Sequence, residues 1–307
     1  MPRLDVLTLV VFVGIVLSMS AHGRGEDLGI IYPEVREPFA SIFNSMLEGI
    51  YEVHGDDAHS VAIKKEYNPQ DIVDWVDDNE ISRIIALGSR SQKLVENIKL
   101  PIDEVVLGAV TKPPENRIFK AGIMLAPAPE RVYEQLEVLL PDLEKIYIVH
   151  SKGSRWYVKI AQKAATDKDF SLEAIETESL AESAKQYKAI MDRIDSQSAV
   201  WLLQDSLSAD SRLLLPMILE AAWNKRFPVI SNSAGHVRRG VLLALYPEPF
   251  EFGVDLAHTT ANGNDEVSGF APFNEALRAA NTRTAEHLGL NWPRSTIRDF
   301  DLVFPSE

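Results

Sequence analysis

Small polar residues follow several apolar runs in this chain, and their side chains are suited to hold a polar molecule. One apolar run is followed by Gln204 and Asp205, and another ends at Ser231. Hydroxyl and free backbone N–H groups beside a helix start can bind a carboxylate or a phosphate. Asp205 could pair with a ligand ammonium, or it could cap the helix predicted over 208–224.

Similar polar clusters follow other apolar runs, at 32–34, 88–91 and 151–156. A single cluster is explained by ordinary helix capping, because Ser and Asn favour that position. Five clusters at the ends of strands favour a shared crevice, since the carboxyl ends of parallel strands face the same side. The candidate ligand-binding residues are therefore Tyr32, Ser89, Ser151, Ser154, Gln204, Asp205, Ser231 and Tyr246.

Aromatic side chains near these clusters could form an apolar wall of the crevice. Tyr32 and Trp156 are the two candidates, and an aromatic or apolar ligand group would pack against them. Trp156 lies early in a predicted helix, so packing within its own lobe explains it equally well. Tyr246 is expected near the hinge between the lobes.

Motifs for catalysis and for metal or cofactor binding are missing from the sequence. It has no G-x-S-x-G elbow, phosphate-binding loop or G-x-G-x-x-G fingerprint. None of the seven histidines shows a metal-binding spacing, and there is no cysteine to act as a thiolate ligand or nucleophile. We therefore predict a protein that is not an enzyme, with no cofactor and no metal site.

Length and charge narrow the class further. A chain of 307 residues with 46% hydrophobic and 25% charged residues is typical of a globular protein and long enough for two domains. Its net charge of −14 argues against nucleic acid as a partner, since such proteins normally carry a basic surface.

The N-terminal segment has the features of an export signal. Arg3 precedes an apolar run over Leu7–Met19, which is shorter than the ~20 residues needed to span a membrane. Small residues follow, so we expect residues 1–23 to be removed, with the mature chain starting near Ala21 or Arg24. Without a cysteine the mature protein is not lipidated, and the predicted location is the periplasm.

Strand and helix patterns alternate through the rest of the chain. Strands are predicted over 28–32, 61–67, 81–87, 105–110, 119–125, 145–149, 171–177, 200–203 and 227–230. Helices are predicted over 39–53, 71–78, 92–98, 128–140, 154–166, 183–194 and 208–224, the last interrupted by Pro216. The pattern predicts an α/β protein with two Rossmann-like lobes joined by a short hinge.

Several segments resemble one known family. They are Ile84–Ser89, Leu139–Val149 with the Ser151–Ser154 loop, Asp205, Gly240–Leu245, Phe252–Ala257 and, most specifically, Asn281–Leu290 with Pro293. Together they resemble ABC transporter substrate-binding proteins of the type I periplasmic-binding fold, in the branch related to tryptophan/tyrosine-binding lipoproteins. The resemblance implies a first lobe of 26–126 plus 248–264, and a second lobe of 127–247 plus 265–307.

The resemblance also implies a function. A protein of this family would close its two lobes on a small polar ligand, such as an amino acid, and deliver it to a membrane permease. The same fold could instead serve as a ligand-sensing subunit for a membrane kinase or diguanylate cyclase. An exported α/β enzyme is the third possibility, and the absence of a nucleophile motif argues against it.

Overall fold

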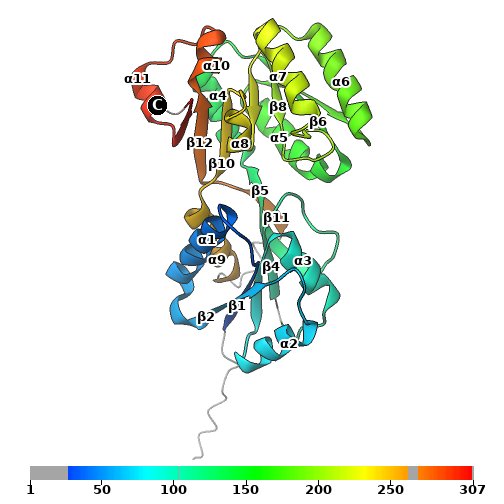
Figure 1. Ribbon diagram of the computed structural model, residues 1–307, viewed down its shortest axis with the longest axis vertical. Coiled ribbons are helices and arrows are strands. Elements are labelled where there is room, and N and C mark those ends of the chain that lie inside the picture. Colours follow the sequence, from blue (N-terminus) through cyan, green and yellow to red (C-terminus); the bar gives the residue numbers. More distant parts are fainter. Residues whose placement is uncertain (1–26, 103, 262–268, 306–307) are drawn as a thin grey trace, which may run out of the picture.

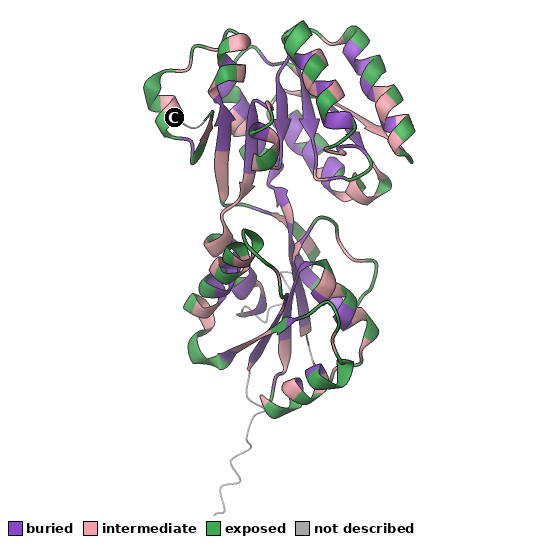
Figure 2. Ribbon diagram, viewed as in Figure 1, coloured by how far each residue is buried: buried purple, intermediate pink, exposed green. Residues whose placement is uncertain are grey.

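The computed structural model describes residues 27–305 apart from 103 and 262–268, and it has two α/β lobes joined at a narrow waist (Figure 1). Each lobe is built around its own sheet, one of six strands and one of seven. The strands are largely buried and the helices expose their outer faces, as Figure 2 shows. This arrangement confirms the predicted fold class.

The first lobe has a fully parallel sheet with the strand order β11-β5-β4-β3-β1-β2. Its strands are β1 (Leu28–Pro33), β2 (Ala58–Ile63), β3 (Arg83–Leu87), β4 (Glu104–Val110), β5 (Phe119–Pro127) and β11 (Gly269–Phe273). Its helices are α1 (Phe39–His54), α2 (Pro69–Asp78), α3 (Gly88–Asn97) and α9 (Pro249–Ala261). Apolar residues of α1 and α9 pack on one face of the sheet, and those of α2 and α3 on the other.

The second lobe has the strand order β13-β12-β10-β9-β8-β6-β7, in which only β10 and β12 pair antiparallel. The strands are β6 (Lys145–His150), β7 (Ser171–Glu176), β8 (Ser198–Leu202), β9 (Val229–Ser231), β10 (Leu243–Pro247), β12 (Ala276–Asn281) and β13 (Leu302–Phe304). The helices are α4 (Pro129–Leu139), α5 (Arg155–Asp167), α6 (Leu180–Arg193), α7 (Leu214–Lys225), α8 (Ala234–Val237), α10 (Thr282–His287) and α11 (Arg294–Arg298). Helices α4 and α5 cover one face, and α6 and α7 the other.

The chain passes between the lobes at three places in the waist. They are the steps from β5 to α4, from β10 to α9 and from β11 to β12, none longer than a few residues. Backbone hydrogen bonds join these crossings, from Ala128 N to Phe273 O at 2.7 Å and from Glu248 N to Glu275 O at 3.4 Å. The predicted short connection between the lobes therefore consists of three chain crossings that are joined to one another by backbone hydrogen bonds.

Strand β11 does not lie in the lobe to which the sequence assigned it. Residues 265–307 were predicted to belong to the second lobe, but β11 pairs in parallel with β5 of the first sheet. The short apolar strand gains a partner at the open edge beside β5 before the chain crosses back to β12. Only the part of the segment from β12 onward joins the second sheet.

Two helix starts also differ from the sequence prediction. Helix α7 begins at Leu214 and not at 208, because the Asp210 carboxylate accepts hydrogen bonds from Arg212 N and Leu213 N and forms a separate turn. Pro216 then falls in the first turn, where it is tolerated without a kink. Helix α3 begins at Gly88, so the polar residues 88–91 form its first turn and not a loop.

Two glycines allow α1 and α9 to pack backbone to backbone in the first lobe. A Cβ atom on Gly49 would lie 2.1 Å from Phe250 O, and one on Gly253 would lie 2.0 Å from Met46 O. No side chain fits at those distances. These contacts hold the returning helix α9 in the first lobe, and they fix the position of the second crossing.

Replacing Gly253 with alanine should destabilise the protein by about 1–3 kcal/mol, because the added methyl forces the two helices apart. Urea unfolding followed by circular dichroism measures the loss. The matched control is Gly235→Ala in α8, where the new Cβ would find its nearest neighbour, Ser233 Oγ, at an ordinary 3.6 Å. Equal stability of the two variants would show that the α1–α9 contact can relax.

Candidate functional site

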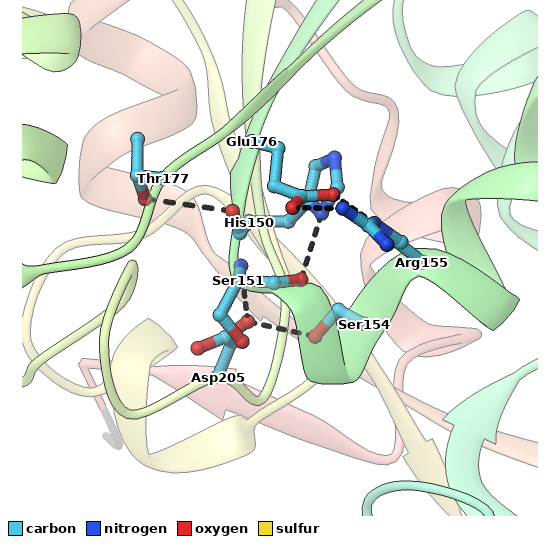
Figure 3. Close-up of polar contacts among 7 residues, drawn as sticks. All are labelled: His150, Ser151, Ser154, Arg155, Glu176, Thr177 and Asp205. Atoms are coloured by element: carbon cyan, nitrogen blue, oxygen red, sulfur yellow. Dashed lines mark hydrogen bonds and ion pairs between the residues drawn. The ribbon is translucent and has the colours of Figure 1, made fainter.

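The loop that follows β6 is held in place by the carboxylate of Asp205, which comes from the end of β8. Asp205 Oδ2 accepts hydrogen bonds from Ser151 N and Ser154 Oγ, each at 2.7 Å, and Oδ1 accepts one from Leu207 N at 3.0 Å. Figure 3 shows Ser151 and Ser154 directed toward this carboxylate. The structure thus brings together three of the predicted residues, and Asp205 orders the loop that carries the other two.

The charge of Asp205 is stabilised within the protein. The residue is only 8% exposed, and this burial alone would raise the pKa of the carboxyl. Hydrogen bonds from Ser151, Ser154 and Leu207 outweigh burial and hold the pKa below its ordinary value. Asp205 is therefore an ionised carboxylate whose main partners are backbone and hydroxyl groups of its own lobe.

An ion pair lies on the outer side of the same loop. Arg155, the first residue of α5, pairs with Glu176 at the end of β7, with Nη2 donating to Oε1 at 2.6 Å. The hydrogen bonds from Arg155 lower the pKa of Glu176. His150 Nδ1 lies 2.9 Å from Ser151 O, and Thr177 Oγ1 donates to His150 O at 3.4 Å (Figure 3). The carboxyl ends of β6 and β7 are thereby fixed against the start of α5.

A narrow crevice lies between the two lobes beside this loop, with a volume of about 10 Å³. Its lining residues come from the first lobe, from the last residues of β5 and from the strand ends of the second lobe. They are Thr111, Leu125, Ala126, Ser154, Trp156, Tyr157, Leu203, Gln204 and Asn232. All nine side chains are uncharged. The space holds about one water molecule, so it marks where the lobes meet without itself accommodating an organic solute.

Trp156 is a large side chain that contacts the cores of both lobes. It packs against the cluster around Tyr133 and Trp201 in the second lobe and against the cluster around Leu107 and Met124 in the first. Its Nε1 is buried and, among the described residues, makes no hydrogen bond. An unpaired indole N–H is unfavourable in a buried position, so it is a donor available to a bound molecule.

Gln204 and Asn232 are positioned by hydrogen bonds within the second lobe. Gln204 Nε2 donates to Asn232 O, and Trp201 Nε1 donates to Asn232 Oδ1, both at 2.8 Å. Trp201 is fully buried, between the edges of the Tyr133 and Tyr157 rings. Tyr157 donates its hydroxyl proton to Pro127 O at 2.8 Å, which ties α5 to the first crossing.

Four predicted residues lie apart from the crevice. Ser89 is exposed in the first turn of α3, and Tyr32, at the end of β1, has its ring beside Phe43. Ser231 is 3% exposed and its Oγ contacts His236 Nδ1 at 2.8 Å. Tyr246 immediately precedes Pro247 at the second crossing, and burial raises its pKa to about 12. Of the eight predicted residues, only Ser154 and Gln204 line the crevice.

Some lining residues were absent from the predicted set although the sequence held a signal for them. Thr111 is the polar residue directly after β4, so the rule that selected the other strand ends also applies to it. Asn232 directly follows Ser231, the last residue of β9, and belongs to the same polar cluster. Trp156 is expected either in the crevice wall or packed within its own lobe; it packs against the cores of both lobes and also lines the crevice.

Other site types find no support in the described part of the chain. Within it, no three His, Asp or Glu side chains are grouped so as to hold a metal ion. Across residues 27–305, leaving out the undescribed positions, no helix is both long and apolar enough to cross a membrane. The expected export signal over 1–23 lies outside the described residues.

Comparison with known proteins identifies the class. The sequence profile of the ABC transporter substrate binding protein family matches residues 68–262, more than half of the chain. The chain belongs to this family, and its two lobes form the type I periplasmic-binding fold. It is thus a solute-binding protein, as the sequence resemblance indicated. A search of curated proteins found no match.

Solved structures share this fold at low sequence identity. The ligand-free, open structure of the substrate-binding protein CD0873 from Clostridium difficile aligns with a TM-score of 0.62 and 16% identity, covering 92% of this chain and all 100% of that one. An ABC domain from Streptococcus pneumonia in complex with L-Trp aligns with a TM-score of 0.57 and 16% identity, covering 91% and 100%. A periplasmic ribose ABC transporter protein from Conexibacter woesei aligns at 0.50 and 14%, covering 86% and 94%.

Replacing Asp205 with asparagine should lower the free energy of unfolding by about 2–3 kcal/mol at neutral pH, because three donors lose the charged acceptor that this buried carboxylate provides. The folded-state pKa of Asp205 is lowered. Its contribution is therefore complete above the ordinary pKa of an Asp carboxyl, about 4, and is lost as the pH falls through the lowered value.

Urea unfolding of wild type and variant between pH 7 and pH 3 measures this dependence. The difference in unfolding free energy should shrink toward the acid end. Asp142→Asn, which changes an exposed carboxyl of the same lobe, is the control and should show a small, constant difference. A pH-independent difference for Asp205→Asn would mean that the charge of Asp205 does not contribute.

Proposed function

We propose that this protein is a periplasmic binding component of an ABC-type uptake system. It closes its two lobes on a small polar ligand, such as an amino acid, and presents that ligand to a membrane permease. The observation that carries the proposal is the crevice at the strand ends, lined by residues of both lobes around Trp156. A ligand held there contacts both lobes at once and stabilises the closed state.

The hydrogen-bonding groups of the crevice favour a ligand with both a donor and an acceptor. Ser154 gives its hydroxyl proton to Asp205, so its oxygen lone pairs remain for a ligand N–H or ammonium. Gln204 uses its amide nitrogen on Asn232 O, which leaves its side-chain oxygen as a second acceptor. Trp156 Nε1 is the donor, and a ligand carboxylate is a suitable acceptor. An amino acid zwitterion meets all three.

Asp205 acts on such a ligand indirectly. Its carboxylate accepts the hydroxyl proton of Ser154. This hydrogen bond polarises the hydroxyl, so that the Ser154 oxygen becomes a stronger acceptor for a cationic group of the ligand. Among the structural neighbours, one is described with L-Trp and another as a ribose transporter. The fold accommodates both classes, so the preference for an amino acid rests on these side chains.

Ligand entry requires the lobes to separate, because a crevice of about 10 Å³ is far smaller than an amino acid. The three short crossings suit a hinge motion of two rigid bodies. Lys112 of the first lobe also lies near Gly153 of the second, since a Cβ added to Gly153 would lie 3.4 Å from Lys112 Cδ. Opening moves these residues apart and breaks the packing of Trp156, and closure around a ligand restores it.

A panel of amino acids, peptides, sugars and purines should contain a compound that raises the melting temperature of the mature protein. A ligand present at 100 times its Kd stabilises the folded state by about 2.7 kcal/mol. Small-angle scattering with the same compound should show a change in the radius of gyration. A sugar that stabilises the protein while every amino acid fails would refute the proposed ligand class, and a panel with no stabilising compound would contradict the proposed uptake role.

Replacing Trp156 with phenylalanine should weaken binding of the identified ligand by about 0.5–1.5 kcal/mol, since one hydrogen bond from Nε1 is lost. The free protein should lose some stability, because the smaller ring gives up packing against the two cores, but it loses no hydrogen bond, since the indole N–H there has no partner. Isothermal titration calorimetry and urea unfolding give the two quantities. Trp292→Phe is the control, because Trp292 Nε1 donates to Leu139 O, away from the crevice. Unchanged affinity in the Trp156 variant would place the ligand elsewhere.

A further inference from the structure

A second hollow lies in the outer part of the second lobe, away from the crevice between the lobes. It has a volume of about 810 Å³ and is formed by α7, the turn before β10, α10 and the end of β13. In Figure 1 helix α10 stands at the outer end of the lobe, and β12 leads to it from the waist. The hollow shares no lining residue with the crevice.

Three arginines line this hollow, Arg238 and Arg239 from the turn after α8, and Arg283 from α10. None of them takes part in an ion pair with a described residue. Arg239 Nη1 donates to Ser211 O, which holds its side chain across the turn. Three cations grouped without a carboxylate from the described residues repel one another, and in a chain with a net charge of −14 such a cluster is unexpected.

Part of the lining of the hollow is apolar. Leu219 and Trp223 of α7 and Phe304 and Pro305 at the end of the described chain form it. Trp223 is 44% exposed, stacks on His287 with ring centroids 3.6 Å apart, and lies 5.9 Å from the Arg283 guanidinium carbon. The carbonyl of Trp223 contacts His287 Nε2 at 2.7 Å, so the indole is fixed in place. A lining that combines arginines with a fixed aromatic ring matches an anion that carries an apolar group.

We propose that this hollow binds an amphiphilic organic anion, a carboxylate, sulfonate or phosphate attached to an aromatic or aliphatic body. The guanidinium groups of Arg238 and Arg283 bind the oxyanion, and the body packs against Leu219 and Trp223. Arg239 adds charge from the side of the turn. The site is separate from the solute site between the lobes, so both can be occupied together.

The probe is 1-naphthoate, compared with neutral 1-naphthamide and with inorganic phosphate in calorimetric titrations at low ionic strength. Naphthoate should bind saturably and at least about tenfold more tightly than naphthamide, because only the anion pairs with the arginines. It should also bind more tightly than phosphate, which gains nothing from the apolar part of the lining. Equal binding of naphthoate and naphthamide, tighter binding of phosphate, or no saturable binding of naphthoate would overturn the proposal.

Naphthoate binding to arginine variants shows whether the probe occupies this hollow. Arg238→Gln and Arg283→Gln should each weaken naphthoate binding by about three- to tenfold, as expected when one charged hydrogen-bonding partner is removed. Arg298→Gln removes an exposed arginine of α11 outside the hollow and should leave binding unchanged. Thermal melts followed by circular dichroism check that each variant is folded. Unchanged binding in both hollow variants, or an equal loss in Arg298→Gln, would contradict the assignment.

The Trp156→Phe variant of the crevice tests whether the second site is independent of the proposed uptake function. Trp156→Phe should leave naphthoate binding intact, and the two arginine variants should keep their affinity for the solute identified by the ligand panel. Loss of naphthoate binding in Trp156→Phe with retention in Arg283→Gln would place the probe between the lobes and overturn the second site. Failure to find a solute in the panel would leave the naphthoate result unaffected.

Discussion

The three chain crossings constrain everything else in this structure. Ala128 bonds to Phe273 and Glu248 bonds to Glu275, so the crossings run side by side through one narrow waist. Because β5 and β10 both end at the waist, the carboxyl ends of the parallel strands of both lobes are directed toward each other. The polar residues that follow these strands therefore meet without any sequence motif that joins them.

Two glycines and one tryptophan define how the chain packs around the three crossings. Gly49 and Gly253 let α9 return closely against α1, which sets where the chain re-enters the first lobe. Trp156 then packs against the cores of both lobes, and its unpaired N–H lies where they meet. A partly buried ring with an unsatisfied donor is a smaller contact than a continuous core.

Electrostatics distinguish the two hollows of the molecule. In the crevice, the Asp205 carboxylate is hydrogen-bonded to its own loop, and the lining offers uncharged polar groups, among them those of Ser154, Gln204 and Trp156. In the outer hollow, three guanidinium groups have no carboxylate partner among the described residues. A neutral lining matches a small polar molecule that must later be released, whereas a lining with three arginines matches an anion. The protein thus presents different chemistry at its two ends.

The sequence by itself determined the fold class and, of the eight predicted site residues, the four that the structure brings together. Apolar runs and helical spacing gave alternating strands and helices, because burial on both faces of a parallel sheet leaves few other solutions. The rule that polar residues collect at strand ends selected Ser151, Ser154, Gln204 and Asp205, which the fold brings together. Tyr32, Ser89 and Ser231 follow the same rule and lie apart, since the rule fixes the end of a strand but not the direction of a side chain.

Tertiary structure decided the rest, through pairings between residues far apart in the chain. Strand β11 joins the first sheet because an open edge beside β5 is within reach, which no local pattern reveals. Asp205 could cap a helix or meet a ligand by sequence alone, and the nearby loop over 151–154 supplied its partners instead. Arg283 reaches Arg238 and Arg239 only because β12 pairs antiparallel with β10 and delivers α10 beside the turn. Such long-range contacts depend on how layers pack, and that information is not contained in the local order of residues.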